Sequence, residues 1–357
     1  RDILRISSKR WLRFQKMMDP NRAPVAFGRR AVPQLFEQLQ VQDPAHKVRA
    51  LTSLCDLVHE PERLYQTVTG GFLKQLQVLL QDEDAAVRSK TCELLQLVMN
   101  HSIGRSALLA SSLLTPLSDL MDDPSASCRT NAHRVLSSLA QMPAGAEALL
   151  SLVHKLMLKL CQLEELRQEK QEEEQELLLS TLTSCSRLDP LPALASDGVR
   201  VLGQTLTHTS PSIRREAAAA LMALSVPADG KQQVCDQGIL SNLLVLLHDR
   251  NLDVQTNAAG VIMNTVIIRP GKYLCLELGV IPVLLELLSE EEDEEQKKRR
   301  KTLVIYCLRA LTALSEAPEG RVILSTALPL LERRRNEQDE DVRRAARTAI
   351  KVVTWKP

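Results

Sequence analysis

The sequence predicts an all-α protein, built as a right-handed helical solenoid of about eight repeats. Three observations lead to this expectation. A short pattern recurs along the 357 residues, with a spacing typical of solenoids made of helical units. Hydrophobic residues are 44% of the chain, but aromatic residues are only 3% and glycine occurs 13 times. Sheets usually contain more aromatic and β-branched side chains, so packing of leucine and alanine between helices is expected.

The recurring pattern begins with an apolar anchor, usually followed by arginine, then small residues and leucines at helical spacing. Its clearest copy runs from Ile213 to Ala218. The step from the anchor at 254 to the anchor at 303 is longer than the others, because the charged segment 290–301 is inserted there. The anchors stand at positions 48, 87, 128, 171, 213, 254, 303 and 342, with an average step of 42 residues.

Each repeat is expected to hold an apolar helix, such as Ile239–Leu247, then a polar turn and a second, longer helix that begins near the anchor. Large residues such as Leu221 and Leu224 share one face of the long helix. Small residues such as Ala217 and Ala258 let neighbouring helices approach closely, so that stacked units bury a continuous core. Glycines expected to break the chain after the long helix are Gly145, Gly230, Gly271 and Gly320.

The domain organisation and the charge of the chain limit the classes of partner that it can bind. The solenoid is expected over 31–357, with an insertion at about 290–301, and residues 1–30 form a basic N-terminal arm or cap. The arm either contacts acidic surfaces or uses Trp11, Leu12 and Phe14 to cap the first repeat. The whole chain carries a formal net charge of only +1, which excludes a globally basic nucleic-acid binder. We expect no nucleic acid, no membrane and no small-molecule substrate as partners.

Neither cofactor chemistry nor catalysis is indicated. The eight cysteines include no C-x-x-C pair, and most lie in apolar helical patterns, where a thiol behaves as a small hydrophobe. This usage favours a reducing compartment. Glycine-rich nucleotide loops, a G-x-S-x-G turn and H-E-x-x-H spacing do not occur in the sequence. We therefore predict no enzyme, no metal and no cofactor.

The repeat resembles armadillo repeats, with HEAT repeats as neighbours. Gly238–Asn264 carries the strongest similarity, and Gly279–Leu288 is similar to the opening of such a repeat. In import receptors of this class, a ladder of Trp and Asn grips a basic peptide. Here Gly260 occupies the Trp position and Asn264 the Asn position, and no Trp occupies the corresponding positions elsewhere. The missing aromatic platforms argue against nuclear import reception.

A closer similarity concerns the radial spoke head 14 homologues, armadillo subunits of the radial spokes of motile cilia. The segments that carry it are Asp19–Pro33, Glu164–Glu176, Glu316–Arg321, Arg344–Arg347 and Trp355–Pro357. The resemblance implies a non-enzymatic scaffold in the cytoplasm and cytoskeleton, in the axoneme of the cilium or flagellum. Its partners would be other radial spoke proteins, with acidic tubulin or spoke surfaces bound by the basic arm. The alternative is a soluble armadillo adaptor that carries a peptide cargo in transport or signalling.

Polar residues at the ladder positions are the candidate partner-binding residues. For Asn131 and Asn257 a structural role is an equal alternative, in which each amide bonds the backbone of an adjacent repeat. A groove of mixed charge suits a partner helix or peptide better than nucleic acid. The candidates are Lys90, Glu93, Asn131, Arg134, Glu216, Asn257, Asn264 and Arg309, together with Arg10 and Arg13 of the arm.

Two charged runs have two interpretations each. Glu290–Lys301 is either a docking loop with a nuclear localisation signal or, as we favour, a lengthened solvated helix. Acid-before-base pairs four residues apart, such as Asp293 with Lys297, would support that helix by about 0.2–0.5 kcal/mol each. Glu164–Glu176 is expected to be a solvated connection between helices, or a contact for a basic partner.

Overall fold

The computed structural model describes residues 19–26, 28–166, 171–290 and 293–355, and every regular element within them is a helix. This confirms the predicted all-α class. The chain divides into two compact units, Arg1–Leu149 and Leu150–Pro357. Arg10, Arg13 and most of the basic arm lie outside the described residues.

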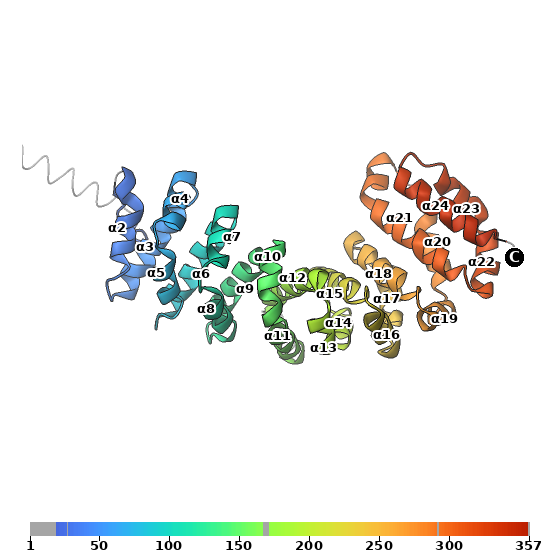
Figure 1. Cartoon of the computed structure of the whole chain (residues 1–357), viewed down its shortest axis with the longest axis horizontal. Helices are drawn as coiled ribbons and strands as arrows, with labels where there is room; N and C mark the ends of the chain where they lie inside the picture. Colours follow the sequence, from blue (N-terminus) through green and yellow to red (C-terminus); the bar gives the residue numbers. More distant parts are fainter. Residues whose placement is uncertain (1–18, 27, 167–170, 291–292, 356–357) are drawn as a thin grey trace, which may run out of the picture. The chain divides into compact units, whose positions relative to one another are not determined.

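The first unit contains three-helix repeats that follow one another along the chain (Figure 1). A short 3-10 turn, η1, precedes them, and a second one, η2, follows α8. Their bounds are η1 Gly28–Arg30, α2 Ala31–Gln38, α3 Pro44–Leu57, α4 Pro61–Thr69, α5 Leu73–Leu79, α6 Ala85–Met99, α7 Ser102–Leu109, α8 Leu114–Asp119, η2 Leu120–Asp122, α9 Ala126–Ala140 and α10 Pro143–Leu149.

The second unit continues the same alternation of short helices and one long helix. It begins with a 3-10 turn, η3, ahead of α11. Its elements are η3 Leu150–Leu152, α11 Val153–Leu166, α12 Glu172–Leu188, α13 Leu191–Ala195, α14 Gly198–Thr205, α15 Pro211–Leu224, α16 Ala228–Asp236, α17 Leu240–Leu246, α18 Leu252–Thr265, α19 Arg269–Glu277, α20 Val280–Ser289, α21 Glu294–Leu314, α22 Pro318–Thr326, α23 Leu328–Arg335 and α24 Glu340–Val353.

The long helices form the continuous part of each unit. In the first unit α6 packs against both α3 and α9, and in the second unit α12, α15, α18, α21 and α24 pack in chain order. Within the described residues these stacked helices number eight, one for each expected repeat. The predicted core residues Leu221, Leu224, Ala217 and Ala258 are all fully buried, so the small residues do lie at the tight contacts between stacked helices.

The glycines expected to break the chain have a different role. Gly145 lies inside α10 and Gly230 inside α16, so the helix breaks come before them. A Cβ on Gly145 would stand 2.0 Å from the carbonyl oxygen of Leu139, and one on Gly230 would stand 1.7 Å from that of Leu224. Each glycine therefore lets the first helix of a repeat cross the carbonyl end of the preceding long helix. Gly271 and Gly320 make the same close approach, six residues after Thr265 and Leu314.

The inserted charged segment lengthens a helix, as the favoured interpretation holds. α21 has 21 residues, whereas α18 has 14. Asp293 begins α21 with a capping box, in which its side chain accepts from the backbone N–H of Gln296, and the side chain of Gln296 accepts from the backbone N–H of Asp293. Lys297 pairs with Glu294 at 2.7 Å, one residue closer in sequence than the predicted pairs.

The acidic run Glu164–Glu176 is less solvated than expected. Glu174 is only 4% exposed on α12. The carboxylate of Glu164 accepts hydrogen bonds from Gln175 at 2.6 Å and from Thr205 at 2.7 Å. Part of this run therefore packs against neighbouring helices, because α11 and α12 are adjacent and place these side chains between them.

The segment before the first repeat is docked on it. The N–H of Ala23 donates to the carbonyl of Arg49 at 3.3 Å, and Ser53 Oγ on α3 donates to the carbonyl of Ala23 at 2.9 Å. Arg63 on α4 donates to the carbonyl of Gly28 at 2.7 Å. Residues 19–30, where described, thus cover the open side of the first repeat, as a terminal cap must.

All eight cysteines are free thiols, and all except the half-buried Cys161 are buried. They are spread over both units rather than gathered in one cluster. Burial raises the pKa of the Cys55, Cys275 and Cys307 thiols to about 12. These side chains therefore pack as small apolar groups and stay protonated at neutral pH.

A candidate protein-binding surface

The predicted candidates of the first unit lie together on two neighbouring long helices. Asn131 on α9 donates to the carbonyl of Ser89 at 3.2 Å and to its hydroxyl at 2.9 Å. Its own side-chain oxygen accepts from Arg134 at 2.6 Å. On α6, Lys90 pairs with Glu93 at 2.8 Å. The structure therefore brings these predicted residues into one polar patch of mixed charge.

Asparagine repeats the same contact in the second unit. Asn257 Nδ2 on α18 donates to the carbonyl of Arg215 on α15 at 3.1 Å. Asn264, two turns further along α18, donates to the carbonyl of Met222 at 3.2 Å and to the hydroxyl of Ser225 at 3.0 Å. The Asn131, Asn257 and Asn264 contacts to backbone carbonyls all span 42 residues. These hydrogen bonds are those of the structural alternative, since they join one long helix to the next.

The Trp position of the import-receptor ladder is closed by side chains from both neighbouring helices. A Cβ on Gly260 would lie 2.3 Å from the sulfur of Met222 and 3.2 Å from the ring of Tyr306. The side chains of Met222 on α15 and Tyr306 on α21 occupy the space beside α18 where the ladder would hold its Trp.

The remaining candidates of the second unit are separated along its long helices. Glu216 on α15 pairs with its neighbour Arg215 at 3.0 Å. Arg309 on α21 is exposed and lines a shallow pocket of about 240 Å³, together with Arg344 and Asp341 of α24.

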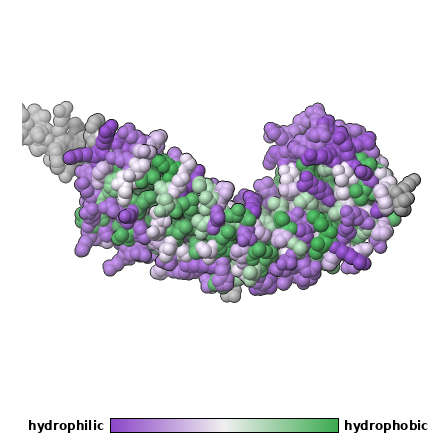
Figure 2. All heavy atoms as spheres, viewed as in Figure 1, coloured by the Kyte–Doolittle hydropathy of each residue, from purple (hydrophilic) through white to green (hydrophobic). Residues whose placement is uncertain are grey.

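In the view of Figure 2, hydrophilic residues gather over α21 and α24. In each unit we call the surface formed by its stacked long helices the long-helix face of that unit; these helices are α3, α6 and α9 in the first unit and α12, α15, α18, α21 and α24 in the second.

A second set of polar residues was missed by the sequence interpretation. A base on one long helix binds an acid in the turn of the next repeat, always 35 residues later, and we call this contact the inter-repeat tie. In the part of the chain that the structure describes, the three ties are Lys47–Asp82 at 2.6 Å, Arg88–Asp123 at 2.7 Å and Arg214–Asp249 at 2.7 Å. The sequence did contain a signal for the ties. In each one a base next to the anchor is followed by an aspartate 35 residues later.

The arginines of the ties also close their own turns. Arg88 Nη1 donates to the carbonyls of Asp82 and Glu83, and Arg214 Nη1 donates to those of His208 and Thr209. These bonds satisfy carbonyl groups that the turn leaves without helical partners. The recurrent arginine of the sequence pattern is therefore a structural residue.

The Arg88–Asp123 tie changes the ionisation of its carboxyl group. Burial alone would raise the pKa of Asp123, but the hydrogen bonds from Arg88 and from the Ser125 N–H outweigh it and hold the pKa below its ordinary value. The same hydrogen bond raises the pKa of Arg88. The side chain of Asp123 is 5% exposed and that of Arg88 13%, so this pair is shielded from solvent and salt.

Among the described residues, no group of three or more His, Cys, Asp or Glu side chains is placed to hold a metal ion. In the same part of the chain no helix is both long and apolar enough to cross a membrane.

Comparisons with known proteins agree with the fold. A family model described as non-SMC mitotic condensation complex subunit 1 matches residues 48–190. The crystal structure of an engineered protein superposes with a TM-score of 0.79 at 20% identity, covering 92% of this chain and 79% of that one. A designed armadillo repeat protein covers 78% of this chain and 99% of its own, at 18% identity and a TM-score of 0.46. The likeness to the engineered protein shows the fold alone, which is an all-α array of helical repeats.

Proposed function

We propose that this protein is a non-enzymatic scaffold subunit of the axonemal radial spoke, which binds other spoke proteins through its long-helix face. Repeat scaffolds of the armadillo and HEAT kind mediate protein–protein interactions and are generally non-catalytic. The matched family model describes a subunit of a multi-protein complex, which supports a role within an assembly. The assignment to the radial spoke is carried by the sequence resemblance of Asp19–Pro33, Glu164–Glu176, Glu316–Arg321, Arg344–Arg347 and Trp355–Pro357.

One structural observation supports treating those segments as meaningful. Arg321, from Glu316–Arg321, lies over the ring of Trp355 with 5.4 Å between the guanidinium carbon and the ring centroid. Its Nε also donates to the carbonyl of Ser315 at 3.1 Å. Two of the segments that carry the resemblance therefore meet in space through Arg321 and Trp355. The proposal places the basic arm, with Arg10 and Arg13, on acidic tubulin or spoke surfaces.

The network on α6 and α9 is the part of the long-helix face best suited to a partner. It holds both signs of charge within hydrogen-bonding reach, which favours a helix or extended peptide of mixed charge. The side chains are held by one another, so little entropy is lost when a partner binds. The soluble adaptor for a peptide cargo would use the same face.

Fractionation and cross-linking of ciliary axonemes test this proposal. The tagged chain is expected to stay with axonemes after a salt wash and to cross-link to radial spoke proteins. The variant K90E/R134E reverses the two bases of the network and should weaken both signals. K74E reverses an exposed base of α5, away from the long-helix face, and should leave them unchanged.

The two functions give different results in this experiment. A transport adaptor would leave the axonemes at the salt wash and appear in the soluble fraction with its cargo. Retention and cross-links that are equal in the wild type and in K90E/R134E would move the binding surface away from α6 and α9.

A further inference from the structure

The inter-repeat tie is missing between α18 and the repeat that follows it in the second unit. At the α15 step, Arg214 binds Asp249. The next positions in the repeat, 41 residues later, hold Gln255 and Glu290. Gln255 carries no charge, so the ion pair cannot form. Glu290 instead pairs with Arg300 of the lengthened helix α21.

An open pocket remains where the tie would be. It has a volume of about 330 Å³, and Arg250, Arg299, Gln255 and Gln296 are among its lining residues. Gln296 uses its Oε1 in the capping box, which leaves its NH₂ group able to donate. The side chains of Arg250 and Arg299 have no hydrogen-bond or ion-pair partner among the described residues, and both are exposed. The pocket therefore gathers hydrogen-bond donors that lack acceptors.

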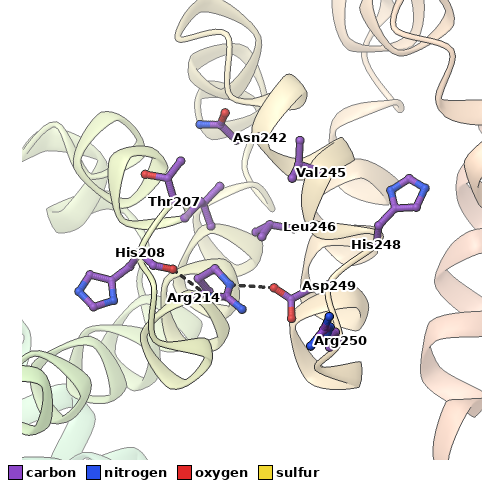
Figure 3. Close-up of a pocket in the computed structure, with 10 residues that line it drawn as sticks. Thr207, His208, Arg214, Asn242, Val245, Leu246, His248, Asp249 and Arg250 are labelled. Carbon is purple, nitrogen blue, oxygen red and sulfur yellow. Dashed lines mark hydrogen bonds and ion pairs between the residues drawn. The ribbon is translucent and has the colours of Figure 1, made fainter.

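A second, larger pocket adjoins the first at Arg250. Its volume is about 600 Å³, and it lies between α14, α17 and the turn before α18 (Figure 3). Leu206 and Leu246 are buried in its floor, whereas Val245 is 70% exposed. The closed Arg214–Asp249 tie forms one wall (Figure 3). This pocket offers an apolar surface immediately beside a cationic one.

The charges of the two pockets do not cancel. The acids in their linings are Asp249 and Glu290, and each already pairs with an arginine. Four arginines against these two acids give a net charge of +2, which belongs to Arg250 and Arg299. Glu291 and Glu292 lie outside the described residues.

We propose that the two pockets form one docking cleft for an extended acidic peptide segment of a partner protein. An aliphatic side chain of the segment enters the apolar pocket over Leu206 and Leu246. Carboxylates that follow it are bound by Arg250 and Arg299, because guanidinium groups pair with carboxylates through two parallel hydrogen bonds. The cleft lies at the N-terminal ends of α18 and α21 and contains none of the partner-binding candidates of the long-helix face, so its test is separate from that of the proposed function.

The first unit supplies a natural contrast at the same place in a repeat. Val78 is the sixth residue of the seven-residue helix α5, and Val245 is the sixth residue of the seven-residue helix α17. Their exposed fractions are 69% and 70%. Five residues after each valine, the turn holds Glu83 in the first unit and Arg250 in the second. The corresponding turn of the first unit therefore carries an acid, and an acidic peptide should avoid it.

Peptide binding to the full chain tests the cleft. The probe is a fluorescein-labelled ten-residue peptide with one leucine followed by four glutamates, and its counterpart has lysines in place of the glutamates. In fluorescence polarisation, the acidic probe should bind and the basic one should not. R250E/R299E should weaken binding at least tenfold, and V245D at least threefold. K298E reverses an exposed base beside Arg299 that does not line the cleft, and V78D alters the matched valine of the first unit. Both should stay within twofold of the wild type.

Circular dichroism melts confirm that each variant is folded, which is expected because the substituted side chains are exposed. A K298E loss as large as that of R250E/R299E would overturn the proposal, because the attraction would then be a general charge effect. Failure of the acidic probe to bind at millimolar concentration would also overturn it. Equal binding of single-stranded oligonucleotide and acidic probe would show a general anion surface and reject the peptide assignment.

Discussion

The contacts that α6 and α18 make with the repeats that follow them differ at the tie position. After α6, Arg88 and Asp123 close the step with an ion pair that is almost completely buried. After α18, Gln255 leaves the position open, and Glu290, 51% exposed, turns to α21 instead. A solenoid needs only some of its ties for stability, because stacked helices carry most of the apolar burial. The contact after α18 can therefore lack a tie and leave the side chains of Arg250 and Arg299 exposed to a partner.

Removing the buried acid should cost the most. Asp123→Asn leaves the Arg88 guanidinium buried with only part of its hydrogen bonding, so we expect a loss of about 3 kcal/mol in the free energy of unfolding. Urea denaturation followed by circular dichroism measures it. A loss below about 0.5 kcal/mol is the contribution of an exposed ion pair. Such a result would mean that the contact with a tie after α6 does not differ in energy from the contact without one after α18.

The pH dependence of the same pair sharpens the comparison. The folded pKa of Asp123 lies below its ordinary value of 3.8, so the stabilisation is complete above that value and is lost as the pH falls through the folded pKa. The stability difference between the wild type and Asp123→Asn should therefore be constant at neutral pH and shrink below about pH 4. A difference that persists unchanged at about pH 3 would show that ionisation of Asp123 is not its source.

Larger side chains at Ala258 and Ala217 test whether the helices around α18 are loosely packed. Ala258 of α18 is fully buried, as is Ala217 of α15. We expect Ala258→Leu and Ala217→Leu each to lower stability by about 1–3 kcal/mol, measured by thermal melts. If Ala258→Leu alone were neutral, slack packing around α18 would explain the open position better than the missing arginine does.

The smallest effect is expected at the open step itself. Glu290→Gln removes an ion pair whose acid is half exposed, and such pairs contribute about 0–1 kcal/mol. The same urea experiment compares it directly with Asp123→Asn. A loss at Glu290 equal to that at Asp123 would mean that the Glu290–Arg300 pair is a substitute tie rather than a surface contact.

Much of this fold could be predicted from the sequence, because periodic burial leaves a direct trace in it. Leu221, Leu224 and Ala217 recur at helical spacing because each long helix meets a neighbour on both sides. The glycines were misread as breaks, since a close approach to a carbonyl such as that of Leu224 depends on tertiary packing. For the same reason the ties were missed, as Arg88 and Asp123 lie on different repeats.

The candidate surface was less predictable. Asn257 and Asn264 have ladder spacing, but only the coordinates show that their amides bond the preceding helix. Arg250 and Arg299 carried no signal, because their importance depends on Gln255 being uncharged at the tie position. A missing partner is visible only after the contacts of the other repeats are known.

The buried cysteines make the stability of individual repeats measurable without any added label. Cys55, Cys92 and Cys128 lie on α3, α6 and α9, and Cys185 and Cys307 lie on α12 and α21. Because alkylating reagents attack the thiolate, a protonated and buried thiol reacts only when its surroundings open. Pulsed alkylation read by mass spectrometry would thus rank the opening rates of successive repeats, because each native cysteine reports on the repeat that contains it.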